Sequence, residues 1–303
     1  QSSIISYLKK HLNELESLLD AIFLLEEVTV KNNSAVAAYG EILSSNIIYE
    51  ILRYNGVKSK LKDARELIQT ETHFEREIVD ESVTVKQIKN YFDKNKSDVT
   101  IIPGFIAKNK KGVTTTLGRG GSDYSAAIIA SIIGADLLEI WTDVSGMYTA
   151  HPKIVAQAKP IKKLSYYEAM ELSHFGAKVI YPPTLQPIIE KNIPIVIKNT
   201  FAPKDSGTLI DNSINNENGE VVKGISHIDN VAMINLEGSG MIGITGFSKR
   251  LFEALSDKDI NVIMITQASS EHSICIGVKE EESILAKKAI DEKFAFEISQ
   301  NKV

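Results

Sequence analysis

Apolar residues recur at helical spacing in the first part of the chain and then give way to shorter apolar runs. Ile4, Leu8, Leu15 and Ile22 fall on one face of a helix with charged residues opposite. The helices that the pattern predicts span 4–25, 44–54, 122–133 and 165–176. The short apolar runs that predict strands span 99–105, 137–144 and 194–199.

Helices and strands alternate as far as residue 210, which predicts an α/β domain with a largely parallel sheet. The polar stretch 211–219 is the best candidate for a linker, so we expect domains over 1–212 and 220–303. The second domain carries strand, helix, strand, strand and helix patterns, which favours a ferredoxin-like unit without an obvious last strand. These elements span 231–236, 247–255, 261–266, 273–278 and 281–293.

Composition narrows the function classes. The chain has 303 residues and a net charge of −5, which disfavours general binding to nucleic acids or membrane surfaces. Its single cysteine, Cys275, excludes an internal disulfide framework and indicates a reducing compartment, so we expect a cytoplasmic protein. No run of 18 apolar residues occurs, and Gln1 opens no signal peptide. We therefore expect this sequence to begin inside a longer protein.

One motif imitates a dinucleotide fingerprint. Residues 238–243 match G-x-G-x-x-G, but Asp257 and Asp259 precede the next strand, whereas the fingerprint needs its acid at that strand's end. The six histidines show no paired spacing, and the acidic stretch 211–220 lacks the glycine and glutamate of a calcium loop. The sequence therefore predicts no protein-bound metal.

The strongest chemical signal is the glycine-rich loop 118–121, which opens a helix. Glycines let a backbone approach an anion, and the amides of a helix start point toward it. Taken alone, the loop is also compatible with a tight turn that packs on the sheet. Thr142, Asp143 and Tyr148 follow the end of an apolar strand, where α/β sheets bind ligands. A simple turn at the end of the strand is the alternative for them.

Two charged residues are ambiguous when they are taken alone. Lys178 stands just past a predicted helix end, where it would neutralise phosphate or complement the helix dipole. Glu41 is either a carboxylate at a helix start or a receptor for an ammonium group.

Taken together, four strings resemble the aspartokinase family, from about Glu41 to the end of the chain. They are Gly118–Asp123, the Trp-Thr-Asp-Val-x-Gly-x-Tyr-Thr string from Trp141, the Glu-Ala-x-Glu-Leu-x-x-Phe-Gly-Ala-Lys-Val string from Glu168 and the Ile-Lys-Asn-Thr-x-x-Pro-x-x-x-Gly-Thr string from Ile197. The resemblance implies a three-layer amino-acid-kinase sandwich with a mainly parallel sheet, followed by a ferredoxin-like ACT domain. It implies phosphorylation of the L-aspartate β-carboxylate by ATP with Mg²⁺, the first step toward lysine, threonine and methionine.

The resemblance also implies a role for each matching residue. Arg119 would clamp the α-carboxylate of aspartate, Glu41 would receive its ammonium group, and Asp123 would lie near the phosphates or the Mg²⁺ shell. The other residues of the substrate site would be Gly120, Gly121 and Ser122. Those of the ATP site would be Thr142, Asp143, Tyr148, Lys153, Lys178 and Val179, with Lys178 stabilising the transferring phosphoryl group.

The small domain resembles the first of two ACT modules in threonine-responsive members of the family. Ile263 stands where lysine-responsive relatives carry an acid, so we expect inhibition by threonine rather than lysine. The expected effector pocket is Met241, Ile244, Phe247, Ser248, Val262 and Gln267. The alternative is that these are ordinary core and turn residues. We expect a homodimer or homotetramer through ACT domains, and no nucleic-acid or membrane partner.

The chain also departs from the family's pattern. The family begins with a Lys-Phe-Gly-Gly strand that is absent from this stretch, so we expect this chain by itself to be inactive or impaired. His151 and Lys153 stand where the family has Asp and Arg, and the second ACT module is expected beyond Val303. Two other functions remain open: another acyl-phosphate-forming amino-acid kinase, and a non-catalytic amino-acid sensor.

Overall fold

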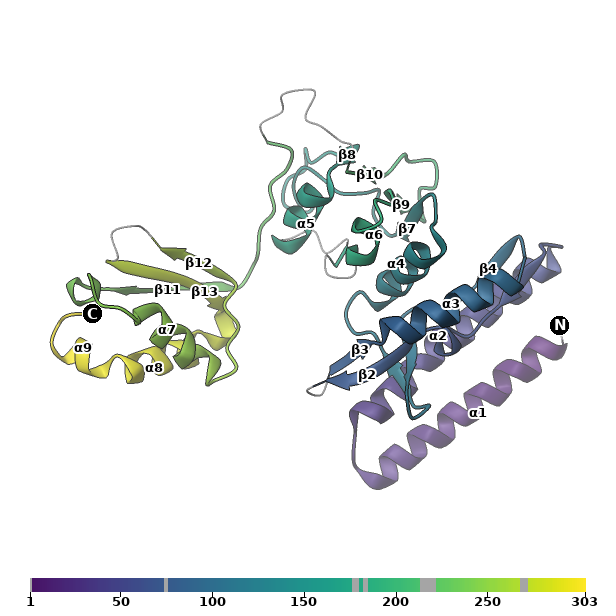
Figure 1. Ribbon diagram of the computed structural model, residues 1–303, viewed down its shortest axis with the longest axis horizontal. Coiled ribbons are helices and arrows are strands. Elements are labelled where there is room, and N and C mark those ends of the chain that lie inside the picture. The colour runs from purple at the N-terminus through teal and green to yellow at the C-terminus, as the bar shows by residue number, and fades with distance from the viewer. Residues whose placement is uncertain (1, 74–75, 176–179, 182–184, 213–221, 268–271) are drawn as a thin grey trace. The chain divides into compact units, whose positions relative to one another are not determined.

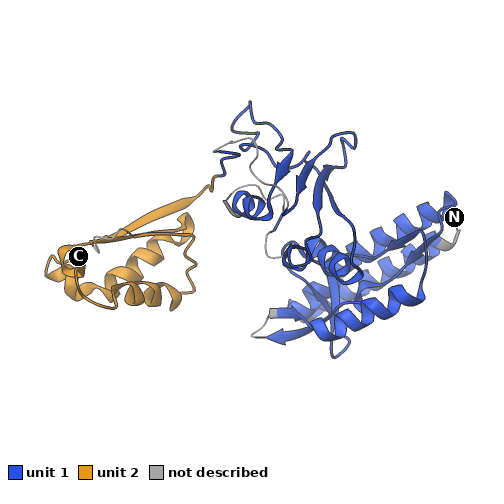
Figure 2. Cartoon of the chain, turned by 45° about the horizontal axis from the view of Figure 1, so that its top comes forward, with its two compact units in different colours: residues 1–226 blue, residues 227–303 orange. Residues whose placement is uncertain are grey.

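The computed structural model divides the chain into two compact units, residues 1–226 and 227–303 (Figure 2). It describes residues 2–303 except 74–75, 176–179, 182–184, 213–221 and 268–271. Most of the predicted linker 211–219 thus lies outside the described residues. Within the described part of the chain, no helix is both long enough and apolar enough to cross a membrane.

The first unit opens with two long helices that pack against each other, α1 (Ser2–Leu25) and α2 (Val30–Tyr54) (Figure 1). The predicted helix over 4–25 is confirmed. The second helix begins 14 residues before the predicted start at residue 44, because the Thr29 hydroxyl caps it by accepting a hydrogen bond from the Asn32 amide at 3.1 Å. Glu41 therefore lies inside α2, and its interpretation as a residue at a helix start is wrong.

Two groups of strands, one short 3-10 helix and two α-helices follow. The described strands are β1 (Ser59–Leu61), β2 (Gln69–His73), β3 (Arg76–Val79), β4 (Val99–Ile101), β5 (Ile106–Asn109) and β6 (Thr114–Thr116). The helices are η1 (Ala64–Glu66), α3 (Glu81–Lys94) and α4 (Gly121–Ile133). β1 pairs with β4 in parallel, and the other strands form a sheet in the order β3-β2-β5-β6. Apolar side chains from this sheet, α3, α4 and the segment before β2 form its core, including Leu67, Ile68, Ile88 and Ile128.

A second sheet has the order β7-β9-β10-β8. Its elements are β7 (Leu138–Thr142), β8 (Lys163–Leu164), β9 (Ile195–Asn199), β10 (Thr208–Ile210), α5 (Tyr166–Phe175) and α6 (Gln186–Ile189). The helix predicted over 165–176 is confirmed, and a capping box opens it: Glu168 accepts from the Ser165 amide at 2.8 Å, and its own amide donates to Ser165 Oγ at 3.2 Å.

The α/β class is confirmed, although the sheets of the first unit are mixed. Parallel pairs join β1 to β4, β2 to β5, β7 to β9 and β8 to β10. Antiparallel pairs join β2 to β3, β5 to β6 and β9 to β10. The basic run at Lys108–Lys111 lies at the hairpin between β5 and β6.

The second unit has the predicted strand-helix-strand-strand-helix order. It comprises β11 (Val231–Glu237), η3 (Ser239–Met241), α7 (Phe247–Ser256), β12 (Met264–Gln267), β13 (Ser273–Lys279), η4 (Glu280–Glu282), α8 (Ser283–Lys293) and α9 (Ala295–Ser299). The strands form an antiparallel sheet in the order β11-β13-β12, and apolar side chains of α7 and α8 pack against it. Half-buried Cys275 lies on the central strand β13.

The rejected dinucleotide motif has a packing role in this unit. The Gly240 amide donates to the Lys302 carbonyl at 3.0 Å, and a Cβ at Gly238 would overlap that same carbonyl. These glycines therefore make room for the chain itself. This role accounts for the motif without a nucleotide.

Candidate active site

The glycine-rich loop forms a tight entry into α4. Gly118 and Gly120 have φ angles of 72° and 68°, in the left-handed region that glycine adopts without steric cost. Gly120 caps α4 without any side-chain hydrogen bond. Since the first amides of a helix have no partner within the helix, this helix start presents N–H groups and a positive dipole end, which suit an anion.

A buried contact with the Phe105 turn fixes the position of this helix start. The Ser125 hydroxyl donates to the Gly121 carbonyl at 2.6 Å and accepts from the Phe105 amide at 2.8 Å. A Cβ on Gly121 would come within 2.8 Å of Phe105 Cδ2, so only glycine fits without displacement. Phe105 itself has φ of 67°, a strained value for a bulky residue. The loop and the Phe105 turn therefore form one locked piece.

Two acidic candidates lie on elements that pack against this piece. Glu41 lies on α2 beside Ala38 and Ile42, which belong to an apolar cluster with Phe105. Asp123 lies in the first turn of α4. Burial raises the pKa of both carboxyl groups above the ordinary value. A nearby cation would therefore stabilise the ionised form of either carboxyl group, and an ammonium group or a metal bound to a nucleotide would supply such a cation.

The candidate nucleotide residues lie at the same edge of the structure as this helix start. α4 precedes β7 and packs on it through Ala127, Ala130 and Ile140. When a short connection reverses the chain between a helix and the following strand, the two run antiparallel. The start of the helix then lies near the end of the strand. Thr142, which ends β7, and the exposed Asp143 therefore lie at the edge that carries the start of α4.

The cationic candidates differ in what the structure shows. Arg119 is exposed, with its guanidinium 5.2 Å from the centre of the Tyr181 ring, and Lys153 is exposed as well. Tyr148 is partly buried and bridges to Pro160. Lys178 and Val179 lie outside the described residues. Whether the charges of Arg119 and Lys178 share one cleft therefore stays a prediction.

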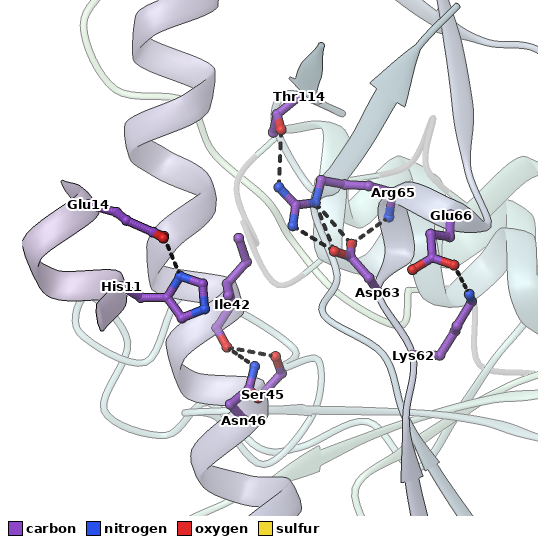
Figure 3. A network of polar contacts seen from close by, with 10 residues as sticks. All are labelled: His11, Glu14, Ile42, Ser45, Asn46, Lys62, Asp63, Arg65, Glu66 and Thr114. Carbon is purple, nitrogen blue, oxygen red and sulfur yellow. Dashed lines mark hydrogen bonds and ion pairs between the residues drawn. The ribbon is translucent and has the colours of Figure 1, made fainter. Parts of the chain in front are cut away.

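A polar network flanks the strand that leads into the glycine-rich loop (Figure 3). Arg65 donates to both carboxylate oxygens of Asp63, with Nη2 to Oδ2 at 2.6 Å, and its Nη1 donates to Thr114 Oγ1 on β6 at 3.2 Å. Burial alone would raise the pKa of Asp63, but the hydrogen bonds and charge of Arg65 outweigh burial and lower it. The hydrogen bond to Thr114 thus ties η1 to β6, and the ion pair with Asp63 neutralises the Arg65 charge.

The expected effector residues fall into two groups in the second unit. Met241 and Phe247 are buried in its core, and Val262 packs against that core. Ile244 and Gln267 are exposed, and Ser248 is partly buried. The buried residues fit the alternative that they are core residues, while the exposed ones are available to a ligand. The turn after Gln267 lies outside the described residues.

Sequence reasoning missed residues that hold the site in place. Ser125 and Phe105 gave no signal, because one stands in a small-residue helix and the other in an ordinary Pro-Gly turn. Arg65 stands in a short polar stretch that predicts no element. Only a contact across the fold identifies any of them.

The acidic residues of the described chain do not form a metal cage. No group of three or more His, Cys, Asp or Glu side chains gathers in the described residues. Mg²⁺ binds most often through one or two carboxylates together with substrate phosphates. Asp123, with an oxygen donor at the start of α4, fits such a contact with a metal carried by the nucleotide.

Comparison with known proteins defines the family. The model of the amino acid kinase family matches residues 5–199, and that of the ACT domain matches residues 234–294. The bifunctional aspartokinase/homoserine dehydrogenase of Haemophilus influenzae is 42% identical over 306 residues, which cover 96% of this chain and 37% of that protein. This chain spans about a third of the length of the curated bifunctional relatives that it matches.

Solved structures show the same fold. E. coli aspartokinase III in complex with lysine and aspartate has a TM-score of 0.75 at 30% identity, covering 97% of this chain and 66% of that one. The same enzyme in complex with aspartate and ADP has a TM-score of 0.69 at 26% identity, covering 96% of this chain and 81% of that one. This chain belongs to the amino acid kinase family and carries an ACT domain, so the predicted fold class is confirmed.

Proposed function

We propose that this chain belongs to an aspartate kinase, which transfers the γ-phosphoryl group of Mg-ATP to the β-carboxylate of L-aspartate. The observation that carries the proposal is the locked start of α4 together with the packing of α4 on β7, from which we infer that the α4 amides and the end of β7 share one edge of the fold. The similarity to proteins named aspartokinase, including structures with aspartate and ADP, supports this choice of substrates.

The proposed reaction needs positioning and charge stabilisation rather than a protein base. The β-carboxylate of aspartate has an ordinary pKa of about 4, so it is already ionised at neutral pH. One of its oxygens forms a bond to the γ-phosphorus while the bond to the bridging oxygen of ADP breaks, and ADP leaves. Two anions must approach each other in this step, so fixed cations and backbone amides lower its barrier.

Each candidate residue has a role in this proposal. Arg119 binds the α-carboxylate of aspartate with its two-donor fork, together with Gly120, Gly121 and Ser122. Glu41 receives the ammonium group, because partial burial raises the pKa of its carboxyl group and a nearby cation would stabilise the ionised form.

The nucleotide and its metal take the other proposed residues. Asp123 faces the phosphates and the Mg²⁺ that the nucleotide brings. Thr142, Asp143, Tyr148 and Lys153 hold the nucleotide, while Lys178 and Val179 stabilise the transferring group.

The kinase test measures aspartyl phosphate directly. The protein expressed from its complete reading frame is incubated with Mg-ATP and L-aspartate or L-glutamate, and hydroxylamine traps the acyl phosphate. We expect trapping with aspartate only. Arg119→Ala should raise the KM for aspartate about 100-fold, a loss of about 3 kcal/mol, which is the upper end for a hydrogen bond between charged groups. Lys111→Ala, which removes an exposed cation at the hairpin tip, is the matched control and should match wild type.

Other outcomes of this assay favour the other functions. Trapping with glutamate alone would favour another acyl-phosphate-forming kinase. A protein that binds an amino acid but traps no acyl phosphate would favour the non-catalytic sensor.

For regulation, we propose feedback inhibition by threonine rather than lysine, through the ACT domain over 220–303, with the catalytic domain over 1–212. The exposed Ile244 and Gln267 offer contacts to a small polar amino acid. We propose that ACT domains also join two or four subunits. Inhibition of the active enzyme by millimolar lysine, with no effect of threonine, would disprove the effector assignment.

A further inference from the structure

We infer that Thr208 is a positioning residue for the nucleotide loop, which we define as residues 142–148. This inference rests on the proposed function, because it takes Asp143 and Tyr148 as nucleotide contacts. It adds a residue that lies in a different element, β10, and has no role in the set assigned above.

The Thr208 hydroxyl joins three segments of the chain. It accepts a hydrogen bond from the Met147 amide at 2.8 Å and donates one to the Ile161 carbonyl at 2.6 Å. The Ile161 amide in turn donates to the Met147 carbonyl at 2.7 Å. Thr208 and Met147 are both fully buried, so water does not replace these bonds. One hydroxyl therefore fixes the backbone of the residue directly before Tyr148.

A second anchor holds the other half of the nucleotide loop. Ser145 Oγ donates to Asp205 Oδ2 at 2.5 Å and accepts from Asn199 Nδ2 at 3.0 Å. The Thr200 amide donates to the Thr142 carbonyl at 2.8 Å, at the start of the loop. Asp143 thus lies between two anchored residues, Thr142 and Ser145, and residues within 199–205 hold both of them.

The close packing around Thr208 leaves room only for glycine at two positions. Gly146 has φ of 108°, and a Cβ there would overlap Thr208 Oγ1 and approach the Thr208 amide within 2.9 Å. Gly207 has φ of 73°, and a Cβ there would overlap the Ile197 carbonyl. The nucleotide loop and Thr208 are thus in direct van der Waals contact, and a displacement of Thr208 is transmitted to the loop.

This arrangement predicts an effect on nucleotide binding and not on aspartate binding. Without the hydroxyl, the buried Met147 amide has no acceptor, so the loop must move to find one. The loop carries nucleotide contacts only, while the proposed aspartate contacts lie on α2 and at the start of α4. A hydroxyl that acts through the loop should therefore change the KM for ATP alone.

The experiment compares Thr208→Val with Thr208→Ser in the protein expressed from its complete reading frame. Valine keeps the volume and loses the hydroxyl, whereas serine keeps the hydroxyl. We expect Thr208→Val to raise the KM for ATP and the Kd for ADP, measured by calorimetry, about tenfold, while the KM for aspartate stays within twofold of wild type. Thr208→Ser should restore both nucleotide constants to within about threefold. Thr72→Val, the same change on an exposed strand residue, is the matched control.

A second variant guards against loss of folding. Asp205 is exposed, so Asp205→Ala should fold and should raise the KM for ATP about threefold by freeing Ser145. Equal rises in both KM values, or unchanged nucleotide constants in both folded variants, would overturn the inference. A wild-type protein that neither binds ADP nor phosphorylates aspartate would instead overturn the proposed function.

Discussion

The contact between Ser125 and Phe105 allows a quantitative test of what holds the active site together. Ser125→Ala removes a hydroxyl that is 2% exposed and bonded to two backbone groups. The Phe105 amide then loses its acceptor, which costs about 1–3 kcal/mol in a buried site. The higher helix propensity of alanine offsets this loss of stability by about 0.5 kcal/mol. The net loss should be about 0.5–2.5 kcal/mol, and a loss of about 2 kcal/mol is roughly a 30-fold smaller folding constant.

The assay uses the only tryptophan of the chain. Trp141 lies on β7 and is 44% exposed, so its fluorescence reports unfolding of the first unit alone. Urea titration of Ser125→Ala should move the midpoint to lower urea with an unchanged m-value. A shift of 2 kcal/mol corresponds to a Tm lower by about 4–8 °C for a unit of this size.

Ser131→Ala is the matched control, because Ser131 lies on the same helix and is partly exposed. We expect that variant to be unchanged or stabilised by up to about 0.5 kcal/mol. If Ser125→Ala unfolds at the same urea concentration as Ser131→Ala, then the contact between Ser125 and Phe105 contributes nothing to stability. In that case the locked piece described above does not exist.

Three further variants test the burial of Asp123 and the space around two glycines. Because burial raises the pKa of Asp123, its folded form favours the protonated acid, and its contribution to stability is lost as the pH rises through the folded pKa. Asp123→Asn should therefore be more stable than wild type at pH 7 and should lose kinase activity. In urea titrations, the difference in free energy of unfolding should shrink toward about pH 4, and a difference independent of pH would contradict this reasoning. Gly121→Ala should destabilise by about 1–3 kcal/mol, since its Cβ would come within 3.1 Å of Leu117 Cβ as well as contacting Phe105. Gly40→Ala, with open space at an exposed position of α2, should stabilise by about 0.5–1 kcal/mol; the opposite order of midpoints would contradict the packing argument.

Sequence patterns predicted the elements that carry apolar faces and missed those held together by polar pairs. The helix over 4–25 and the strand at 195–199 are amphipathic or apolar, so their spacing is visible in the sequence. Thr70 on β2 and Thr115 on β6 are buried, and their hydroxyls form a hydrogen bond of 2.9 Å between two strands of mostly polar sequence. Threonine-rich strands look like loops until a partner strand is known. The first half of α2 was missed for a related reason, since Asn32, Asn33 and Gly40 are weak helix formers that tertiary packing overrides.

For the candidate site, the sequence predicted the residues expected to touch ligands better than those that hold them. The glycine-rich loop carries its signal in its own composition, and the structure has left-handed glycines there. Gly207 and Thr208 belong to a string that resembles the family, yet the string does not predict that the Thr208 hydroxyl accepts a hydrogen bond from the Met147 amide. Such roles depend on distances between residues about 60 positions apart, 208 against 147, and these distances exist only in the folded chain.

The left-handed torsion of Phe105 has a consequence for how this protein could be stabilised. A glycine at that position would relax the backbone, but it would remove the ring that fills the space against Gly121 and the Ala38 cluster. The packing of the Phe105 ring at the junction of three elements therefore offsets the cost of its unfavourable torsion. A search for more heat-resistant variants should therefore leave residue 105 unchanged and look for gains at exposed helix positions instead.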